Sequence, residues 1–190
     1  KGINFSVEPG DFYALLGPNG AGKTTAIGII SSLVNKSGGE VEVFGHNIDT
    51  DLAAAKSCIG LVPQEVNLNL WEGVHSIVLN QAGYYGLGRH LAQKRAEKYL
   101  RKLGLWEKRF DRARELSGGM KRRLMIARAL VHEPRLLILD EPTSVLTPAE
   151  ADQILGLMRE MSDARRLSVV LITHKLREVE QFARDVTVLR

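Results

Sequence analysis

The chain has 190 residues, 44% of them hydrophobic, and its 26 basic and 22 acidic side chains give a formal net charge of +4. This length supports one sizeable core and argues against a second full domain, and so small a charge excess does not indicate direct nucleic-acid binding. The single cysteine, Cys58, excludes an internal disulfide and a cysteine-based metal site, and it fits the reducing conditions of the cytoplasm.

The first part of the chain predicts an edge hairpin followed by a strand, a glycine loop and a helix. Residues 3–7 alternate apolar and polar side chains as a half-buried strand does, and residues 9–11, Pro-Gly-Asp, supply a turn. The apolar run 12–16 ends at Gly17, and residues 23–34 carry apolar side chains at helical spacing. Two further strands are predicted over residues 41–44 and 59–62.

The middle of the chain predicts a helical insertion, because residues 74–85 and 91–103 favour helices with no strand between them. After it, helices are predicted over residues 120–131, 148–161 and 175–183, and strands over 135–139, 168–173 and 186–189. Strands that alternate with helices imply a mostly parallel sheet covered on both faces, with ligand sites beyond the carboxyl ends of the strands.

Residues 17–24, Gly-Pro-Asn-Gly-Ala-Gly-Lys-Thr, match the phosphate-binding loop G-x-x-x-x-G-K-[ST] between a predicted strand and a predicted helix. The glycines let the backbone wrap phosphates so that its N–H groups point inward, and the helix N-terminus adds its positive dipole end. Lys23 is expected to reach the β- and γ-phosphates and Thr24 to offer a hydroxyl to Mg²⁺. The alternative is a glycine-rich turn with a surface lysine. The residues expected to contact the nucleotide are Gly17, Pro18, Asn19, Gly20, Ala21, Gly22, Lys23, Thr24 and Thr25.

The predicted strand 135–139 is followed by two carboxylates, Asp140 and Glu141, which it delivers to the sheet edge where the phosphates lie. Asp140 is expected to hold Mg²⁺, through water. Glu141 is expected to polarise the attacking water as the general base. Alone, such a pair is more often a helix cap or a solvated charge, and the phosphate loop is what favours the functional interpretation.

Residues 116–120, Leu-Ser-Gly-Gly-Met, stand at the start of a predicted helix, where a hydroxyl, two glycines and a helix N-terminus make a second surface for anions. By itself this segment is also an ordinary turn and N-cap. The three motifs in their order resemble the ATP-binding cassette (ABC) family over essentially the whole chain. The resemblance implies an α/β fold: a P-loop NTPase (RecA-like) core with a mostly parallel sheet, an N-terminal antiparallel β edge and an inserted α-helical subdomain.

The resemblance also implies how the chain is divided. Residues 1–190 would be a single ABC ATPase domain truncated at both ends, and the aromatic residue that stacks on adenine in the family would precede the first residue, which would weaken base binding. Residues 1–64 and 135–190 would form the catalytic core. Residues from about 65 to 134 would form the helical subdomain with the signature motif.

By resemblance, Gln64 is the Q-loop glutamine, which would touch Mg²⁺ and the water, and His174 is the switch histidine, which would contact the γ-phosphate and orient the water. The expected catalytic residues are therefore Glu141, His174, Lys23 and Gln64, and the expected metal-binding residues are Thr24, Gln64 and Asp140. In the family, two domains pair head to tail, so Ser117, Gly118 and Gly119 would contact the ATP held by the partner's phosphate loop.

The function implied by the resemblance is an ATP-binding and ATP-hydrolysing transporter subunit, with ATP and Mg²⁺ as cofactors. Its expected partners are a second ABC ATPase domain, in a homodimer or heterodimer, and membrane-spanning subunits at the cytoplasmic face of the membrane. The longest apolar run, residues 26–34, is far shorter than the roughly 20 residues that cross a bilayer. The alternatives are a soluble ABC ATPase that remodels a nucleic-acid or ribosomal partner, and a weakly hydrolysing dimerisation scaffold.

Two positions depart from the family pattern, since Met120 stands where glutamine is common and Thr147 where aspartate is common. Residues up to about Pro142 resemble bacterial drug and polysaccharide exporter ATPases, and the remainder resembles nucleoside and simple-sugar importer ATPases. This division leaves a hybrid origin open and names no transported substrate.

Two groups in the insertion and the helix after it also require an interpretation. Either Trp71, Tyr84 and Tyr85 line the groove that receives a membrane partner, or they fill the core of the helical subdomain. A solvated helix face is expected for the basic residues Lys121, Arg122, Arg123 and Arg128.

Overall fold

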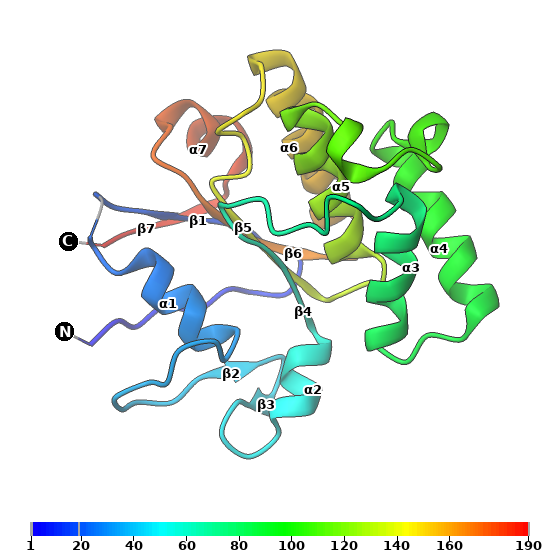
Figure 1. The fold of residues 1–190 in the computed structure, drawn as a ribbon. Coiled ribbons are helices and arrows are strands. Elements are labelled where there is room, and N and C mark those ends of the chain that lie inside the picture. The colour runs from blue at the N-terminus through cyan, green and yellow to red at the C-terminus, as the bar shows by residue number, and fades with distance from the viewer. Residues whose placement is uncertain (1, 19, 190) are drawn as a thin grey trace.

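Five parallel strands form the centre of the molecule in the computed structural model, which describes residues 2–18 and 20–189 (Figure 1). Their order is β4-β5-β6-β1-β7, and every neighbouring pair is parallel. In that order the strands are β4 (Ile59–Val62), β5 (Leu136–Asp140), β6 (Ser168–Ile172), β1 (Phe12–Leu16) and β7 (Asp185–Val188). The prediction of a mostly parallel sheet is confirmed, and the carboxyl ends of these strands meet at one edge.

Alternate side chains of the central strands enter two separate cores. On β1, Phe12 belongs to the larger core and Tyr13 to the smaller one, and on β6 the same division separates Val169 from Val170. Successive side chains of a strand point to opposite faces of its sheet. A strand buried on both faces therefore reads as a nearly continuous apolar run, as residues 169–172 of β6 do.

Helices cover both faces of the sheet (Figure 1). Side chains of α1 (Lys23–Ile30) and α2 (Leu52–Ser57) contribute to the smaller core. The larger core is packed by α3 (Val74–Tyr84), α4 (Arg89–Lys102), α5 (Gly118–Leu130), α6 (Pro148–Asp163) and α7 (Leu176–Phe182). Two short 3₁₀ helices, η1 (Trp106–Lys108) and η2 (Ala113–Glu115), lie between α4 and α5. Within the described residues, every helix is too short or too polar to cross a membrane.

The helices of the insertion pack through small and aromatic side chains. On α4 the buried residues are Ala92, Ala96, Tyr99 and Leu100, a spacing that places them on one face of a helix. Beside α3, Tyr85 stacks on His132 with ring centroids 3.6 Å apart and planes 4° from parallel. The His132 Nε2 atom lies 3.0 Å from the carbonyl oxygen of Ile59. Burial lowers the pKa of His132 to about 4, so this ring is neutral at neutral pH.

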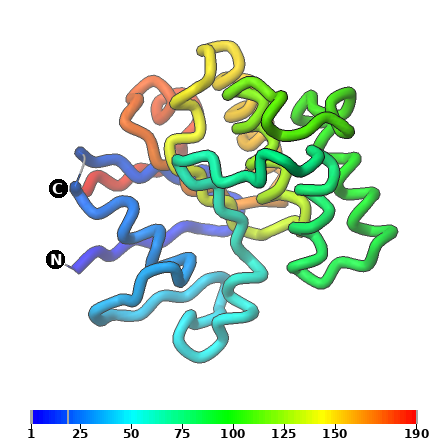
Figure 2. Tube along the Cα trace, in the orientation of Figure 1, coloured from blue at the N-terminus to red at the C-terminus, as the bar shows by residue number. Residues whose placement is uncertain are grey.

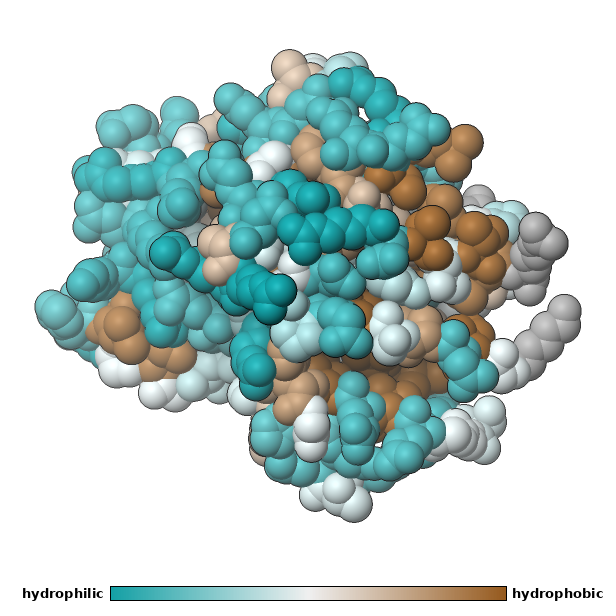
Figure 3. Space-filling view, turned by 180° about the vertical axis from the view of Figure 1, so that it is seen from behind, coloured by the Kyte–Doolittle hydropathy of each residue, from teal (hydrophilic) through white to brown (hydrophobic). Residues whose placement is uncertain are grey.

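The N-terminal segment differs from the predicted hairpin. Residues 3–7 form no strand, and the antiparallel pair of the structure joins β2 (Glu42–Val43) to β3 (His46–Asn47) instead. The predicted alternation is nevertheless present, because Phe5 and Val7 pack against the smaller core. Figure 2 follows the backbone of this segment and of residues 41–44. A hollow of about 830 Å³ lies between this segment and β2, and both hydrophobic and polar side chains line it (Figure 3). Strand pairing requires backbones about 4.8 Å apart, and within the described residues no ladder joins this segment to β2.

The first helix ends at Ile30 rather than at Val34 as predicted. Ser32 adopts a left-handed φ of 56°, and the N–H groups of Leu33 and Val34 both donate to the carbonyl oxygen of Gly28. The chain thus turns back over its own helix, where a Cβ atom at Gly28 would lie 2.6 Å from a methyl carbon of Val34. Only glycine at this position lets the turn pack so closely.

Candidate functional site

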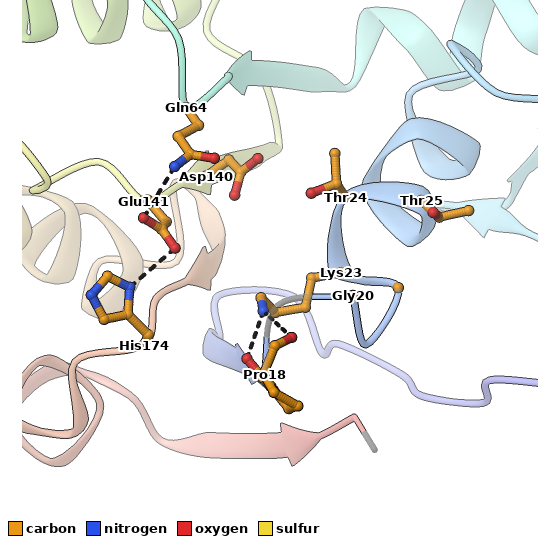
Figure 4. Close-up of a pocket in the computed structure, with 11 residues that line it drawn as sticks. Pro18, Gly20, Lys23, Thr24, Thr25, Gln64, Asp140, Glu141 and His174 are labelled. Atoms are coloured by element: carbon orange, nitrogen blue, oxygen red, sulfur yellow. Dashed lines mark hydrogen bonds and ion pairs between the residues drawn. The ribbon is translucent and has the colours of Figure 1, made fainter.

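A cleft of about 680 Å³ lies at the edge where β1, β4, β5 and β6 end (Figure 4). Gly17 directly follows β1 and Glu141 directly follows β5, while Gln64 and His174 each stand two residues after their strands. Parallel strands bring these distant positions of the chain to one place. The cleft is lined by Gly17, Pro18, Gly20, Gly22, Lys23, Thr24, Thr25, Gln64, Asp140, Glu141 and His174.

The phosphate loop supplies one wall of the cleft. Gly20 and Gly22 have left-handed φ angles of 83° and 95°, which side chains rarely allow. The Lys23 ammonium group donates to the carbonyl oxygens of Gly17 at 2.6 Å and Pro18 at 2.9 Å, which holds it over the loop. Of the other predicted residues, Ala21 lies in the loop but is not part of the cleft lining, and Asn19 falls outside the described residues.

The start of α1 is suited to an anion. Gly22 is its N-cap, its first turn has no side-chain cap, and that turn contains no acidic residue. Backbone N–H groups at such a helix end have no partner within the helix, and together they carry the positive end of its dipole. These features fit the phosphate groups of a nucleotide.

The opposite wall carries the two carboxylates. Asp140 is only 8% exposed, and its pKa is raised by burial and by the neighbouring charge of Glu141, an effect that the charges of Arg122 and Lys23 oppose. Glu141 has a left-handed φ of 44°, and its backbone N–H donates to the carbonyl oxygen of Ile172 at 2.9 Å. The β6 strand therefore holds the main chain of Glu141 at the end of β5.

The Glu141 carboxylate lies between two polar side chains (Figure 4). The Gln64 amide group donates to one carboxylate oxygen at 3.3 Å, and the His174 Nδ1 atom lies 3.1 Å from the other. A hydrogen bond from Nδ1 requires the proton on that nitrogen. The residues expected to surround an attacking water thus contact one another directly.

The oxygen donors in the cleft are chemically suited to Mg²⁺. Thr24 presents a hydroxyl, Asp140 a carboxylate and Gln64 an amide oxygen, and Mg²⁺ prefers such hard oxygen ligands. Within residues 2–18 and 20–189 no cluster of three or more His, Cys, Asp or Glu side chains is arranged to hold a metal ion. A magnesium ion here would therefore depend on nucleotide phosphates and water for its remaining ligands, as is usual for this ion.

The predicted signature residues do not line this cleft. Ser117 is the N-cap of α5 and accepts a hydrogen bond from the backbone N–H of Met120 at 3.2 Å. Ser117 and Gly118 are exposed and Gly119 is buried. The structure thus brings the phosphate loop, Gln64, the carboxylates and His174 together and leaves the signature residues on a separate surface.

A buried carboxylate that the sequence did not indicate lies next to the strand end that carries His174. Glu178 is 6% exposed and accepts hydrogen bonds from the hydroxyls of Thr143 at 2.5 Å and Thr173 at 2.8 Å. The Lys175 ammonium group donates to the carbonyl and hydroxyl oxygens of Thr143, both at 3.0 Å. Glu178 therefore ties the segment after Glu141 to the segment before His174. No local pattern distinguishes it from Glu180, the exposed acidic residue of the same helix.

We expect Glu178→Ala to lower the free energy of unfolding by about 2 kcal/mol, because it leaves the buried hydroxyl groups of Thr143 and Thr173 without their acceptor. Urea unfolding of the variant and the parent measures this difference. Glu178→Gln keeps the shape and one acceptor oxygen, so it should lose less. Glu180→Ala, at an exposed position of the same helix, serves as the control. Equal stability of Glu178→Ala and the parent would contradict this role.

The threonine at the position where the family often has aspartate has a clear local role. Thr147 is the N-cap of α6, and it forms a reciprocal capping box with Glu150. The Glu150 carboxylate also accepts from Arg123 of α5 at 3.2 Å. Threonine and aspartate both serve as N-caps, so Thr147 keeps the start of α6 in place.

The prediction that four basic residues of α5 form a solvated face is wrong for one of them. Arg122 is 1% exposed, whereas Lys121, Arg123 and Arg128 are partly exposed. Arg122 lies on the face of α5 that is directed toward the ends of β4 and β5, where its side chain donates to main-chain oxygens.

The aromatic residues of the insertion divide between the two interpretations. Trp71 and Tyr84 are 68% and 86% exposed, so they do not fill a core. Tyr85 is half-buried against His132 and is part of the packing between the insertion and β4.

Comparisons with known proteins agree with this geometry. The family model described as "ABC transporter" matches residues 1–144. The chain is 42% identical over 180 residues to the linearmycin resistance ATP-binding protein LnrL of Bacillus subtilis, covering 95% of this chain and 58% of LnrL. It is 34% identical over 193 residues to the methionine import ATP-binding protein MetN 1 of Listeria monocytogenes, covering 100% of this chain and 57% of that protein. The chain thus spans less than two thirds of the length of these relatives.

A solved structure extends the comparison to the fold and the ligands. A post-hydrolysis state of the ATP-binding cassette MJ0796, dimeric and bound to ADP and Pi, superposes with a TM-score of 0.89 at 27% identity, covering 100% of this chain and 85% of that one. The names of the relatives include both resistance and import, in agreement with the two resemblances in the sequence. Because the family model covers most of the chain and the fold agrees, this chain belongs to the ABC transporter family as an ATP-binding domain.

Proposed function

We propose that this chain is the ATP-binding and ATP-hydrolysing part of an ABC transporter, and that it powers transport across a membrane through ATP-driven pairing with a second ABC ATPase domain. The observation that carries the proposal is the position of the Glu141 carboxylate. Gln64 and His174 hold it at a cleft whose other wall presents Lys23 and Thr24. A carboxylate opposite a wall with a lysine and a threonine hydroxyl supports the roles proposed below.

In this proposal each residue of the cleft has a distinct role. Lys23 and the N–H groups at the start of α1 bind the β- and γ-phosphates. Thr24, Asp140 and Gln64 would hold Mg²⁺, which would neutralise charge on the phosphates. Glu141 accepts a proton from the attacking water as the bond from phosphorus to the leaving ADP oxygen breaks. The hydrogen bond from His174 fixes the orientation of that carboxylate.

The position of the signature residues supports the need for a second domain. Ser117 and Gly118 are exposed at the N-terminus of α5 and do not line the cleft of their own chain. We infer that they contact the nucleotide held by a second domain, which is a homodimer or heterodimer partner. The dimeric state of MJ0796 supports this arrangement.

Membrane-spanning subunits are the proposed partners of the helical insertion, which would hold this chain at the cytoplasmic face of the membrane. Trp71 and Tyr84 are large, exposed side chains on this part of the molecule, and Leu70 beside Trp71 is 41% exposed. Exposed aromatic residues of this kind are enriched where proteins contact each other. They support the docking interpretation over the core interpretation.

The dependence of activity on protein concentration tests the enzyme against the scaffold. Specific ATPase activity of the full-length protein should rise with concentration, because hydrolysis requires two chains to meet. A rate that stays at zero across the range would favour the scaffold alternative.

Mixing two inactive variants tests whether the sites are shared between chains. Lys23→Ala disables the phosphate loop and Ser117→Arg disables the signature, so each alone should be inactive. Random pairing of the two should restore roughly a quarter of the parent rate, because about half of the dimers then hold one intact site. No restoration would contradict a site completed by the partner chain.

A further inference from the structure

Arg122 is one of four basic residues of α5 that the sequence predicts to be solvated. It is the largest fully buried side chain in the described part of the chain. Arg122 is 1% exposed, and its guanidinium group donates to four backbone carbonyl oxygens. Its Nε atom bonds the oxygen of Pro142 at 2.9 Å, and one terminal nitrogen bonds that of Pro63 at 2.5 Å. The other terminal nitrogen bonds the oxygens of Asp140 at 3.0 Å and Glu141 at 2.6 Å.

These four carbonyl groups belong to the two strand ends that carry the catalytic candidates. Pro63 follows β4 and directly precedes Gln64, and the other three end β5 and continue through Glu141. The left-handed conformation of Glu141 turns successive carbonyl groups toward one point. A planar fork of five N–H donors spans such a set, whereas a lysine ammonium group offers three donors from a single atom.

A buried guanidinium group is costly unless its donors are satisfied, and here four main-chain oxygens satisfy them. The nearby negative charges of Asp140 and Glu141 favour its cationic form, but the hydrogen bonds of this group within the described residues go to the four main-chain oxygens. The adjacent Arg123 contacts Glu150 instead, on a different element. What distinguishes Arg122 from its neighbours is that it donates hydrogen bonds to the main chain at the ends of β4 and β5.

We propose that Arg122 is a positioning residue for hydrolysis, which fixes the main chain of Glu141 and Gln64 and links it to the helix that begins at Ser117. This inference rests on the proposed role of Glu141 as the base. Nucleotide binding depends on the opposite wall of the cleft, where Lys23 and Thr24 stand on the loop and α1. Loss of the guanidinium group therefore acts on the orientation of the base and leaves the phosphate contacts of Lys23 and the loop in place.

The test compares Arg122→Gln and Arg122→Lys with Lys121→Gln, a change of the same charge one residue earlier on α5. In the full-length protein, Arg122→Gln should lower kcat by about 10- to 100-fold, the effect of misplacing a catalytic group by about 1 Å. Its KM and its affinity for ADP should stay within about threefold of the parent, since these report ground-state binding. The kcat of Arg122→Lys should lie between those of Arg122→Gln and the parent, and the kcat of Lys121→Gln should match that of the parent.

A double-mutant cycle with Glu141→Gln separates positioning from a general structural role. If Arg122 acts through Glu141, then adding Arg122→Gln to Glu141→Gln should not slow the residual turnover further. Multiplied effects in the double variant would overturn the proposal, as would an unchanged kcat in folded Arg122→Gln, or a loss of ADP affinity as large as the loss of kcat.

Two controls distinguish a loss of activity from a loss of folding. Thermal midpoints and ADP binding show whether each variant is folded, and Arg122→Lys, which keeps a buried cation among the four carbonyl groups, carries the test if Arg122→Gln does not fold. Then an unchanged kcat in Arg122→Lys overturns the proposal. Full turnover in Glu141→Gln alone would instead overturn the proposed function, which is a separate result.

Discussion

Glu141→Gln is expected to lower the turnover number by about 10²- to 10⁴-fold, the range for removal of a general base. Glutamine keeps the shape of the side chain and can still contact Gln64 and His174, but it cannot take a proton from water. The interaction that is lost exists only in the transition state, so nucleotide affinity should stay within about threefold of the parent. Steady-state ATPase assays and calorimetric titration with ADP measure the two quantities.

Glu180→Gln is the matched control for this experiment, because it makes the same substitution at an exposed position of α7. It should leave both quantities unchanged. A Glu141→Gln protein with the turnover of the parent would remove Glu141 from the mechanism. A variant that also fails to bind ADP would show that the carboxylate supports the cleft rather than the reaction.

Lys23→Ala is expected to weaken nucleotide binding itself by about 10- to 100-fold, the loss typical of a charge-assisted hydrogen bond. In the structure, the Lys23 ammonium group is held at 2.6 Å and 2.9 Å from two carbonyl oxygens of its own loop, where it faces the cleft. A fixed positive charge in that place attracts the β- and γ-phosphates before any chemical step. Calorimetric titration with Mg²⁺ and ADP measures the change.

The control for Lys23→Ala is Lys56→Ala, which removes an exposed lysine from α2. It should bind ADP as the parent does, because it lies outside the residues that line the cleft. Unchanged ADP affinity in folded Lys23→Ala would contradict the assignment of residues 17–24 as the phosphate loop.

The sequence by itself determined the elements whose patterns are local. The glycines and the lysine of residues 17–24 follow one apolar strand, and Asp140 and Glu141 end another. Because the strands are parallel, residues that follow them must share one edge, which is why the cleft contains Gln64 and His174 as predicted. The phosphate loop and the two carboxylates were predicted from spacing within one segment and from a rule about parallel sheets, whereas Gln64 and His174 were assigned by the family resemblance.

The tertiary structure alone decided which polar side chains become buried and which strands find a partner. Residues 3–7 alternate as a strand does, but their backbone lies across a hollow from β2 and forms no ladder. Arg122 stands among other basic residues of α5, and only the packing of that helix against β4 and β5 directs it to four carbonyl groups. Burial depends on how elements meet in space, and neighbours on the chain carry no signal of it.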